Sequence, residues 1–382
     1  MPVEKTITKA LRYAKRLVSF DTTSHRSNRL ICKYLEMKLT KHGFLIERTE
    51  YVDEAGVRKE NLIAKKGVGT GGLAYFAHSD VVPASNWFDG TPGPFDPTVV
   101  GDRLYGRGSC DMKGSIACML AAVQMFELDD LKQPLYFVVT ADEETGFAGA
   151  RSVVEDSKIY REIVDHGTRA IIGEPTSLDV VYAHKGIYQI TATATGRAGH
   201  SSTREGLNAN LAMIPFLQDL KNLRSITETD TAWQNDLFDP PTLTMNICIK
   251  DNAEATNVTP SKSVCRTSLR PMPGVDVEPL IEKLVDSAQQ NSLQLKIQRH
   301  GAPMLTDVGS DFVAQALELS DRQQPRSACY GTDGGVFTEI ENKIVIGPGS
   351  IDQAHTHDEW ISLDQLDKGT ELFARMIRRW CG

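Results

Sequence analysis

The amino-acid sequence predicts an α/β fold in which a larger domain is interrupted by a smaller α+β domain. The chain has 382 residues, enough for about two to three domains of ordinary size. In the first half, continuous apolar runs of strand length alternate with helical patterns, which is typical of a sheet covered on both faces. The middle follows a strand–helix–strand–strand–helix–strand pattern, which indicates a small ferredoxin-like sandwich. We therefore expect a larger domain formed by residues 1–182 and 299–382, and a lid formed by residues 183–298.

The individual elements follow from the length and period of the apolar runs. Short continuous runs predict buried strands at 73–77, 135–139, 170–172 and 343–346. Longer apolar patterns predict helices over 116–128 and 363–379. In the lid, we expect strands at 188–195, 242–249, 264–269 and 293–298, and helices at 208–223 and 277–289.

The N-terminal residues combine apolar and basic positions at helical spacing. Leu11, Ala14 and Leu17 repeat along one face, and basic residues beginning with Lys5 lie between them. We expect a surface helix of the folded domain. A transit peptide is the alternative, because such peptides are also amphipathic and basic, but the acidic Glu4 disfavours it. With no secretory signal pattern, the expected location is the cytoplasm.

Composition and charge exclude several classes of protein. The hydrophobic fraction of 41% and the charged fraction of 24% are ordinary for a globular protein. A net charge of −8 argues against a broad nucleic-acid-binding face, although a small local basic patch stays open. The longest apolar stretch, 116–123, is too short to cross a membrane. Seven scattered cysteines without a C-x-x-C pair argue against a disulfide framework and a thiolate zinc cluster.

Acidic residues and histidines follow the expected buried strands of the larger domain. In an open α/β sheet, ligands bind outside the carboxyl ends of the strands, so these side chains are expected to gather at one edge. Nitrogen and oxygen ligands without thiolates suit zinc or cobalt in a catalytic site, and this set is large enough for two ions that share a carboxylate. The candidate ligands are His78, Asp111, Glu144, Glu174 and His355.

Each candidate also has an ordinary reading when taken alone. A single histidine such as His78 is more often a buried, hydrogen-bonded residue than a ligand, and residues 142–144 read equally well as a solvated turn. Competing motifs are incomplete. Gly106 begins a G-x-G pattern, but Asp111 stands where a dinucleotide fingerprint needs glycine, and neither a P-loop nor a G-x-S-x-G elbow occurs. Cys110 has no partner base in the sequence that would favour a nucleophile.

Four motifs resemble the co-catalytic zinc aminoacylase and carboxypeptidase superfamily. They are His78-Ser79-Asp80, residues 106–114 (GRGSCDMKG), Ala141-Asp142-Glu143-Glu144, and Gly173-Glu174-Pro175-Thr176. The resemblance spans nearly the whole chain. Further segments, including residues 174–178, 199–202 and 347–355, look closest to the acetylornithine deacetylases within this superfamily.

The resemblance implies a zinc-exopeptidase-like catalytic domain with a mixed, mainly parallel sheet, and it implies roles for the residues at the sheet edge. His78 and Glu174 would bind one metal ion, Glu144 and His355 the other, and Asp111 would bridge the two. Asp80 would orient the His78 ring, as metal-bound imidazoles usually require. Glu143 would be the general base, and we expect it to point away from Glu144 because neighbouring side chains alternate in an extended chain.

Matches in the lid, and one at Thr332 outside it, imply substrate contacts and a homodimer. His200 matches a histidine that reaches the partner subunit's site, and Arg270 matches an arginine that grips the substrate carboxylate. Asn257 and Thr332 match positions near the substrate. The Gly334-Gly335 pair departs from the acidic residue that many acetylornithine enzymes carry in this loop, so the amino acid of the substrate stays open at this point.

The activity implied is removal of the acetyl group from N2-acetyl-L-ornithine, a step of arginine biosynthesis, by a dimer with two zinc or cobalt ions per subunit. The alternatives are other N-acyl amino acids, such as N-acetylcitrulline or N-succinyl-diaminopimelate, and dipeptidase or carboxypeptidase activity. A non-catalytic relative is disfavoured because all matched positions are filled. Nucleic-acid and membrane partners are not expected, because the net charge is negative and no basic-aromatic patch occurs.

Overall fold

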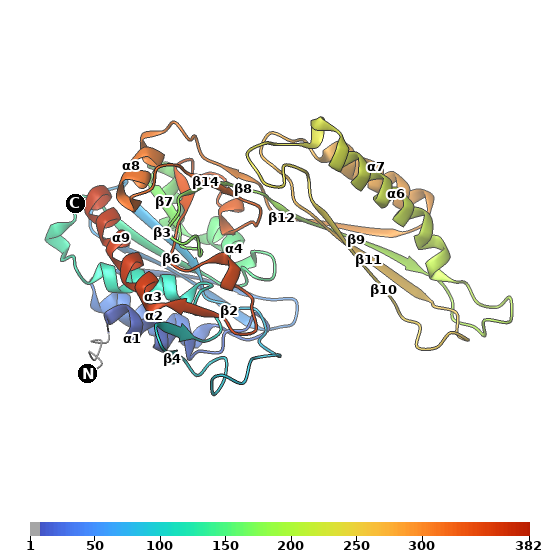
Figure 1. Cartoon of the computed structure of the whole chain (residues 1–382), viewed down its shortest axis with the longest axis horizontal. Coiled ribbons are helices and arrows are strands. Elements are labelled where there is room, and N and C mark those ends of the chain that lie inside the picture. Colours follow the sequence, from blue (N-terminus) through green and yellow to red (C-terminus); the bar gives the residue numbers. More distant parts are fainter. Residues whose placement is uncertain (1–7) are drawn as a thin grey trace. The chain divides into compact units, whose positions relative to one another are not determined.

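The computed structural model describes residues 8–382, which divide into two compact units (Figure 1). Lys5 and Glu4 lie outside the described residues. The first unit runs to Tyr182 and includes residues 306–326 and 332–382. The second unit consists of residues 183–305 and 327–331. The last strand of the expected lid, predicted at 293–298, continues to Gly301.

The first unit contains most of the helices and most of a large mixed sheet, and residues 183–184, 304–305 and 327–328 of the second unit also belong to strands of this sheet. Its helices are α1 (Lys9–Val18), α2 (Arg29–Lys41), α3 (Lys113–Val123), α4 (Ala148–Asp156), α5 (Lys158–Asp165), α8 (Asp311–Ser320) and α9 (Leu363–Cys381). The nine strands of the large sheet are β1 (Leu45–Val52), β2 (Arg58–Lys66), β3 (Leu73–His78), β6 (Leu135–Thr140), β7 (Arg169–Ile172), β8 (Val181–His184), β13 (Met304–Leu305), β14 (Arg326–Ala328) and β15 (Lys343–Val345).

The large sheet is mixed, and its parallel strands lie at its centre. The strand order is β1-β2-β6-β3-β7-β15-β8-β13, with β14 beside β8. The strands β6, β3, β7 and β15 run parallel to one another, whereas β1, β2, β8 and β13 join by antiparallel pairing. This α/β architecture confirms the predicted fold class. The parallel centre also explains why the runs of β3 and β6 are apolar without alternation, since both strands are buried along their whole length.

Helices cover the sheet, and α3 is enclosed among them. It packs against α1, α9 and β3 (Figure 1), and all of its residues are buried. The helix ends at Val123 rather than at the expected residue 128. Glu127 and Asp130 form a capping box that starts a separate 3₁₀ turn, η1 (Leu128–Asp130), instead of continuing α3. The apolar face of α1 belongs to the same core cluster, as expected for a helix of the folded domain.

A small sheet outside the main layer joins two loops of the first unit. Its strands are β4 (Thr98–Val100), β5 (Arg103–Tyr105) and β16 (Trp360–Ser362), in the order β16-β5-β4. Two 3₁₀ turns, η3 (Asp333–Gly335) and η4 (Ile351–Gln353), lie on the chain before β16. No helix within residues 8–382 has the length and apolar character that crossing a bilayer requires.

The second unit has the order of elements expected for a ferredoxin-like sandwich. Its elements are β9 (Ile187–Thr195), α6 (Ala209–Thr229), η2 (Thr231–Trp233), β10 (Met245–Asp251), β11 (Lys262–Leu269), α7 (Glu278–Gln290) and β12 (Gln294–Gly301). The four strands form an antiparallel sheet in the order β10-β11-β9-β12. Both helices pack on one face of this sheet, and β10 lies at its edge (Figure 1).

Candidate metal centre

The parallel strands bring three of the candidate ligands to one edge of the large sheet. His78 is the last residue of β3, and it pairs in register with Thr140, the last residue of β6. Glu144 follows β6 and Glu174 follows β7, so both leave the sheet at the same end. Strand order and direction alone therefore gather these side chains, as a doubly covered parallel sheet requires.

The other two candidates come from loops rather than from strand ends. Asp111 lies in the loop between β5 and α3, two residues before the helix begins. His355 lies between η4 and β16, and its backbone φ is +64°, in the left-handed region. The antiparallel pairing of β5 with β16 holds the two loops together, with Tyr105 opposite Trp360.

The first group of donors consists of His78, Asp111 and Glu174, all buried. Nε2 of His78 lies 3.0 Å from Oδ1 of Asp111 and 3.7 Å from Oε1 of Glu174. Each residue offers one atom, and the three atoms lie within 4.8 Å of one another. A single ion can therefore contact all three side chains.

The second group consists of Asp111, Glu144 and His355, so Asp111 belongs to both groups. Nε2 of His355 lies 3.3 Å from Oδ2 of Asp111 and 3.0 Å from Oε2 of Glu144. The two oxygens of one carboxylate thus face two different imidazoles. This arrangement has the form of a bridging ligand between two ions.

The donor set fits two divalent cations. Donor atoms that share one tetrahedral zinc ion at about 2 Å lie roughly 3.3 Å from one another, and the separations of 3.0 to 3.7 Å in both groups are close to this value. Three carboxylates face only two imidazoles, so the groups carry an excess of negative charge that cations would balance. Nitrogen and oxygen donors without thiolates suit zinc or cobalt.

Asp80 contacts residues of both donor groups on the side away from the donor atoms. Its Oδ1 lies 3.6 Å from Nδ1 of His78, on the side of the ring opposite to the ligand nitrogen. The carboxylate also accepts hydrogen bonds from the backbone N–H groups of Glu143 (3.1 Å) and Glu144 (3.3 Å) and from the hydroxyl of Ser24 (2.8 Å). The backbone carbonyl oxygen of Asp80 lies 3.0 Å from Nδ1 of His78 and is the hydrogen-bond partner of the ring, while the Asp80 carboxylate holds the segment that carries both glutamates.

The side chains of Glu143 and Glu144 point to different places, as expected, but the alternation of an extended chain is not the reason. Both residues lie in a turn rather than in extended chain. Asp142, directly before them, has φ of +56°, and this left-handed residue reverses the chain. Glu144 reaches His355, whereas Glu143 belongs to neither donor group. Glu143 is therefore left over for another role beside the cluster.

The pKa values of the cluster are shifted by burial and by the mutual contacts. Burial raises the pKa of Glu143 well above its usual range, and it raises the pKa of Glu174 to about 8. For Asp111, burial alone would raise the pKa, but hydrogen bonds from His355 and His78 hold it well below its usual range. Strong shifts concentrated in one small region are typical of a functional site.

The predicted lid residues lie in the second unit, at two different ends of its sheet. His200 and Asn257 are exposed neighbours: His200 pairs with Val258 in a β-bridge, and the N–H of Ser201 donates to the carbonyl of Asn257 (3.0 Å). Arg270 follows Leu269 at the far end of β11. Because β11 has eight residues, the strand separates the two ends by roughly 25 Å.

Thr332 lies in the first unit and is buried. Its hydroxyl oxygen accepts a hydrogen bond from the N–H of Gly334 (3.0 Å) and thereby caps η3. The neighbouring Asp333 is also buried, and one of its oxygens accepts a 2.6 Å hydrogen bond from Thr140 at the end of β6. The loop that carries Thr332 is thus attached to the same sheet edge as the donor groups.

Several residues that support the site were not identified from the sequence. Glu359 and Arg107 form a buried ion pair (2.6 Å) beside the Asp111 loop, and Lys59 and Asp142 form another (2.6 Å) beside Glu143. Glu359 follows His355 by only four residues, but a glutamate in a polar loop gives no signal of burial. Lys59 lies in an antiparallel strand with a charged neighbourhood, which is typical of an exposed position.

Comparison with known proteins identifies the group of enzymes to which this site belongs. A model of peptidase family M20/M25/M40 matches residues 74–379, which include all five donors and Glu143. The chain belongs to this family. Membership in the M20 family makes the protein a hydrolase of amide bonds, and it confirms the resemblance that the motifs carry.

Individual relatives agree with this assignment. An acetylornithine deacetylase from Myxococcus xanthus is 34% identical over 96% of each chain. Among solved structures, an M20 family metallo-carboxypeptidase from Sulfolobus solfataricus superimposes with a TM-score of 0.76 at 16% identity, covering 97% of this chain and 99% of the other. The YXEP protein of Bacillus subtilis, described as a dinuclear metal-binding M20 peptidase, gives 0.63 at 15% identity and 97% coverage of both chains. These two structures share the M20 fold with this chain.

Proposed function

We propose that this protein is a metal-dependent amidohydrolase that removes the acetyl group from N2-acetyl-L-ornithine, giving L-ornithine and acetate, a step of arginine biosynthesis. The observation that carries the proposal is the placement of Asp111 between two groups of donors. Two ions held close together in this way could act on a single amide group of the substrate. The match of nearly the whole chain to an acetylornithine deacetylase supports this substrate class.

The proposed metal ligands are His78 and Glu174 for one ion, Glu144 and His355 for the other, and Asp111 for both. Zinc is the expected ion and cobalt the expected substitute, because the donors are imidazoles and carboxylates. When bound, such ions polarise the amide carbonyl and lower the pKa of water. The negative charge of the three carboxylates and their short distances to the two imidazole nitrogens support this assignment.

Glu143 is the proposed general base. It lies beside the donor groups without joining either, and burial raises the pKa of its carboxyl, which suits a group that must take and return a proton. In the proposed reaction, Glu143 accepts a proton from the attacking water and passes it to the leaving nitrogen of the amide. The Asp80 carboxylate fixes the position of Glu143 through the backbone hydrogen bond of 3.1 Å, and Asp80 orients His78 through its backbone carbonyl, 3.0 Å from Nδ1, with the carboxylate 3.6 Å from the same nitrogen.

The lid residues support a homodimer. The substrate is a small molecule, and an acyl amino acid is much shorter than the strand β11 that separates His200 from Arg270 within one lid. One subunit therefore cannot place both residues on one substrate. We propose that Arg270 holds the carboxylate of the substrate, that Asn257 and Thr332 line its site, and that His200 of the partner subunit stabilises the oxyanion of the transition state.

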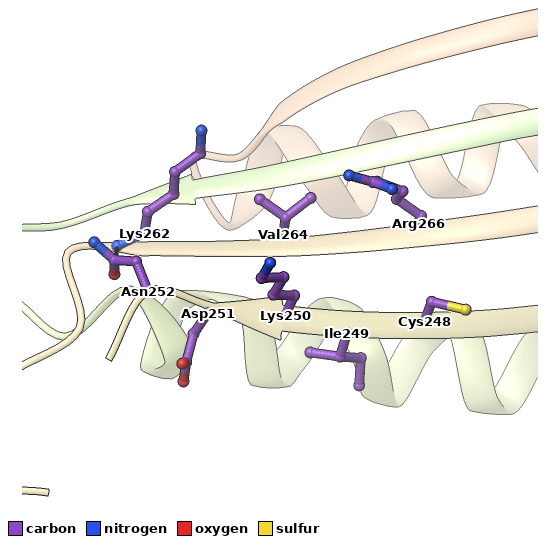
Figure 2. Close-up of a pocket in the computed structure, with 8 residues that line it drawn as sticks. All are labelled: Cys248, Ile249, Lys250, Asp251, Asn252, Lys262, Val264 and Arg266. Carbon is purple, nitrogen blue, oxygen red and sulfur yellow. Dashed lines mark hydrogen bonds between the residues drawn. The ribbon is translucent and has the colours of Figure 1, made fainter. Parts of the chain in front are cut away.

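The edge of the lid sheet is the proposed dimer interface. The strand β10 pairs on one side only, with β11, so its other edge offers free backbone groups. Figure 2 shows residues of β10 and β11, with Lys250 and Cys248 on one face of the sheet and Ile249 on the other. Ile249 is 58% exposed, and Leu211 and Ile214 on α6 are 67% and 56% exposed. These apolar side chains would be covered by a second copy of the lid.

A cytoplasmic location belongs to the proposal as well. All seven cysteines are free thiols, and five of them are buried, which suits a reducing compartment. The alternatives for the substrate are N-acetylcitrulline, N-succinyl-diaminopimelate and dipeptides. No arrangement in the described residues favours one of these over N2-acetyl-L-ornithine.

The experiment that tests the function measures amine release from N2-acetyl-L-ornithine. Protein stripped of metal with a chelator is assayed before and after reloading with zinc or cobalt. We expect no release from the stripped protein and full release after reloading. The same assay with N-acetylcitrulline, N-succinyl-diaminopimelate and a dipeptide panel ranks the substrates by kcat/KM. Two bound ions together with a higher kcat/KM for one of the other substrates would overturn the acetylornithine assignment and keep the hydrolase.

A further inference from the structure

The carboxylate of Glu359 is fully buried and accepts four hydrogen bonds from one short loop. Oε1 accepts from the backbone N–H groups of Cys110 (2.9 Å) and Asp111 (3.0 Å). Oε2 accepts from the N–H of Gly108 (2.9 Å) and from Nη1 of Arg107 (2.6 Å). Three backbone N–H groups within residues 108–111 thus converge on one anion, much as in a backbone nest. The loop between β5 and α3 is wrapped around this side chain.

The ion pair of Arg107 and Glu359 connects the loop of Asp111 to the loop of His355. Nη2 of Arg107 donates to the carbonyl of Thr356 (2.9 Å), directly after His355, and more weakly to the carbonyl of Pro83 (3.4 Å). In addition, the N–H of Gly106 donates to the carbonyl of Glu359 (3.1 Å), which extends the pairing of β5 with β16 by one step. The ligand loops therefore share one buried support.

Because the Arg107–Glu359 ion pair is buried, replacing either of its residues is expected to disturb the loops that it holds. Both side chains are at most 3% exposed, so neither charge is hydrated by bulk water. A buried carboxylate or guanidinium is stable only while its partners remain in place. The hydrogen-bonded geometry of Glu359 consequently fixes the backbone at Asp111, whose two oxygens face both donor groups.

We propose that Glu359, together with Arg107, is a positioning residue that sets the bridging geometry of Asp111 and so controls the affinity of both metal positions. This inference rests on the proposed metal centre. Glu359 does not touch a donor atom of either group and acts through the backbone of Asp111. Since Asp111 serves both positions, we expect a change at Glu359 to weaken both ions together rather than one of them.

The test is the substitution Glu359→Gln, which keeps the shape of the side chain. An amide offers one acceptor oxygen, and its NH₂ group faces N–H donors that it cannot satisfy, so the loop 108–111 must shift. We expect the Kd of each zinc ion to rise roughly 10- to 100-fold, the usual effect of changing the partner of a metal ligand. Competition with a chelating dye measures both constants, and the visible spectrum of the cobalt-loaded protein reports the ligand geometry. At saturating zinc, kcat should recover and KM should stay unchanged.

The matched control is Glu339→Gln, which removes the carboxylate of an exposed Arg–Glu pair with Arg161. This variant should bind zinc like the wild type. If Glu359→Gln does not fold, the double variant Arg107→Gln/Glu359→Gln removes both buried charges and is expected to fold with weakened zinc binding. Wild-type zinc affinity and an unchanged cobalt spectrum in a folded Glu359→Gln or double variant would overturn the inference. Failure of the wild type to bind two ions would instead overturn the proposed metal centre.

Discussion

Lys59 and Asp142 form a buried ion pair, with Nζ 2.6 Å from Oδ1 and the side chains only 1% and 5% exposed. The hydroxyl of Tyr51 donates to the second oxygen of Asp142 (2.8 Å). Asp142 has a left-handed φ of +56° and stands directly before Glu143 and Glu144. The ion pair therefore fixes the turn that presents the proposed base and one proposed ligand.

We expect Lys59→Met to destabilise the protein and to lower kcat. The substitution leaves the carboxylate of Asp142 buried without its cation, which reduces the free energy of unfolding by about 3–5 kcal/mol. Urea denaturation of the metal-free protein measures this change. The double variant Lys59→Met/Asp142→Asn removes both charges and should recover most of the stability. A single variant as stable as the wild type would mean that water or Tyr51 compensates the charge and that the pair does not hold the turn.

Glu143→Gln should abolish proton transfer while leaving the metal ions bound. The amide is nearly isosteric but cannot accept a proton, so we expect kcat to fall by about 10² to 10⁴. Metal content, measured by elemental analysis after dialysis, should equal that of the wild type because Glu143 belongs to neither donor group. Glu155→Gln, an exposed glutamate on α4, is the control. Loss of one ion in Glu143→Gln would show that Glu143 is a ligand instead.

Asp111→Asn and Glu174→Gln should differ in how many ions they weaken. Asp111 contributes an oxygen to each donor group, whereas Glu174 contributes to the first group only. Zinc titration by calorimetry should therefore show two weakened sites for Asp111→Asn, and one weakened and one nearly normal site for Glu174→Gln. Equal effects of the two substitutions would argue against a bridging role for Asp111.

Strand order explains why the centre of the fold was predictable from the sequence. The runs 73–77, 135–139 and 170–172 within β3, β6 and β7 are apolar without alternation, which predicts buried strands and is typical of a parallel sheet covered on both faces. The flanking strand β1 was missed, because its pattern of exposed charges, as at Arg48 and Glu50, is also typical of a surface loop. A capping box that begins only four residues after the end of a helix, as at Glu127 after Val123, is hard to distinguish from the helix itself.

Most of the proposed ligands were predictable because they follow buried strands. The buried charged residues that hold the ligand loops were not predictable. His78, Glu144 and Glu174 follow buried strands, so topology places them at one edge. Glu359 and Lys59 act through long-range hydrogen bonds to backbone and side chains that lie far away in the sequence. The hydrophobic period of the sequence does not indicate such pairings, because they depend on how two loops meet after folding.

Lys343→Met is expected to stabilise the protein at neutral pH. Lys343 is buried in β15, its ammonium donates to the carbonyl of Ile340 (2.6 Å), and burial lowers its pKa to about 8. The unfolded chain keeps a lysine pKa near 10.4, so between these values the unfolded state binds more protons and the wild type gains stability as the pH rises. Below pH 8 the wild type must bury a charged amine, and methionine relieves this penalty of about 3 kcal/mol.

The measurement is the free energy of unfolding of Lys343→Met and wild type at several pH values from 7 to 10. The difference should be largest at pH 7 and shrink steadily above pH 8. Lys283→Met, at an exposed position on α7, is the control and should show no such trend. A constant difference across this range would mean that the substitution acts through packing and not through the charge.

Mixing two inactive variants tests whether His200 acts across the dimer. His200→Ala should lack the group that stabilises the oxyanion, and Glu143→Gln should lack the base. If His200 serves the partner subunit, a mixed dimer has one complete site, formed by Glu143 of the first subunit and His200 of the partner subunit. Random exchange of equal amounts makes half of the dimers mixed, so about one quarter of the wild-type activity should return.

The size of the recovery distinguishes the two arrangements. If His200 instead serves its own subunit, each site of a mixed dimer lacks one group, and no activity returns beyond that of the separate variants. Subunit exchange is verified with an affinity tag on one variant, so that a lack of recovery cannot be blamed on a failure to mix. The separation of His200 and Arg270 along β11 predicts recovery, because only two subunits can bring both side chains to one small substrate.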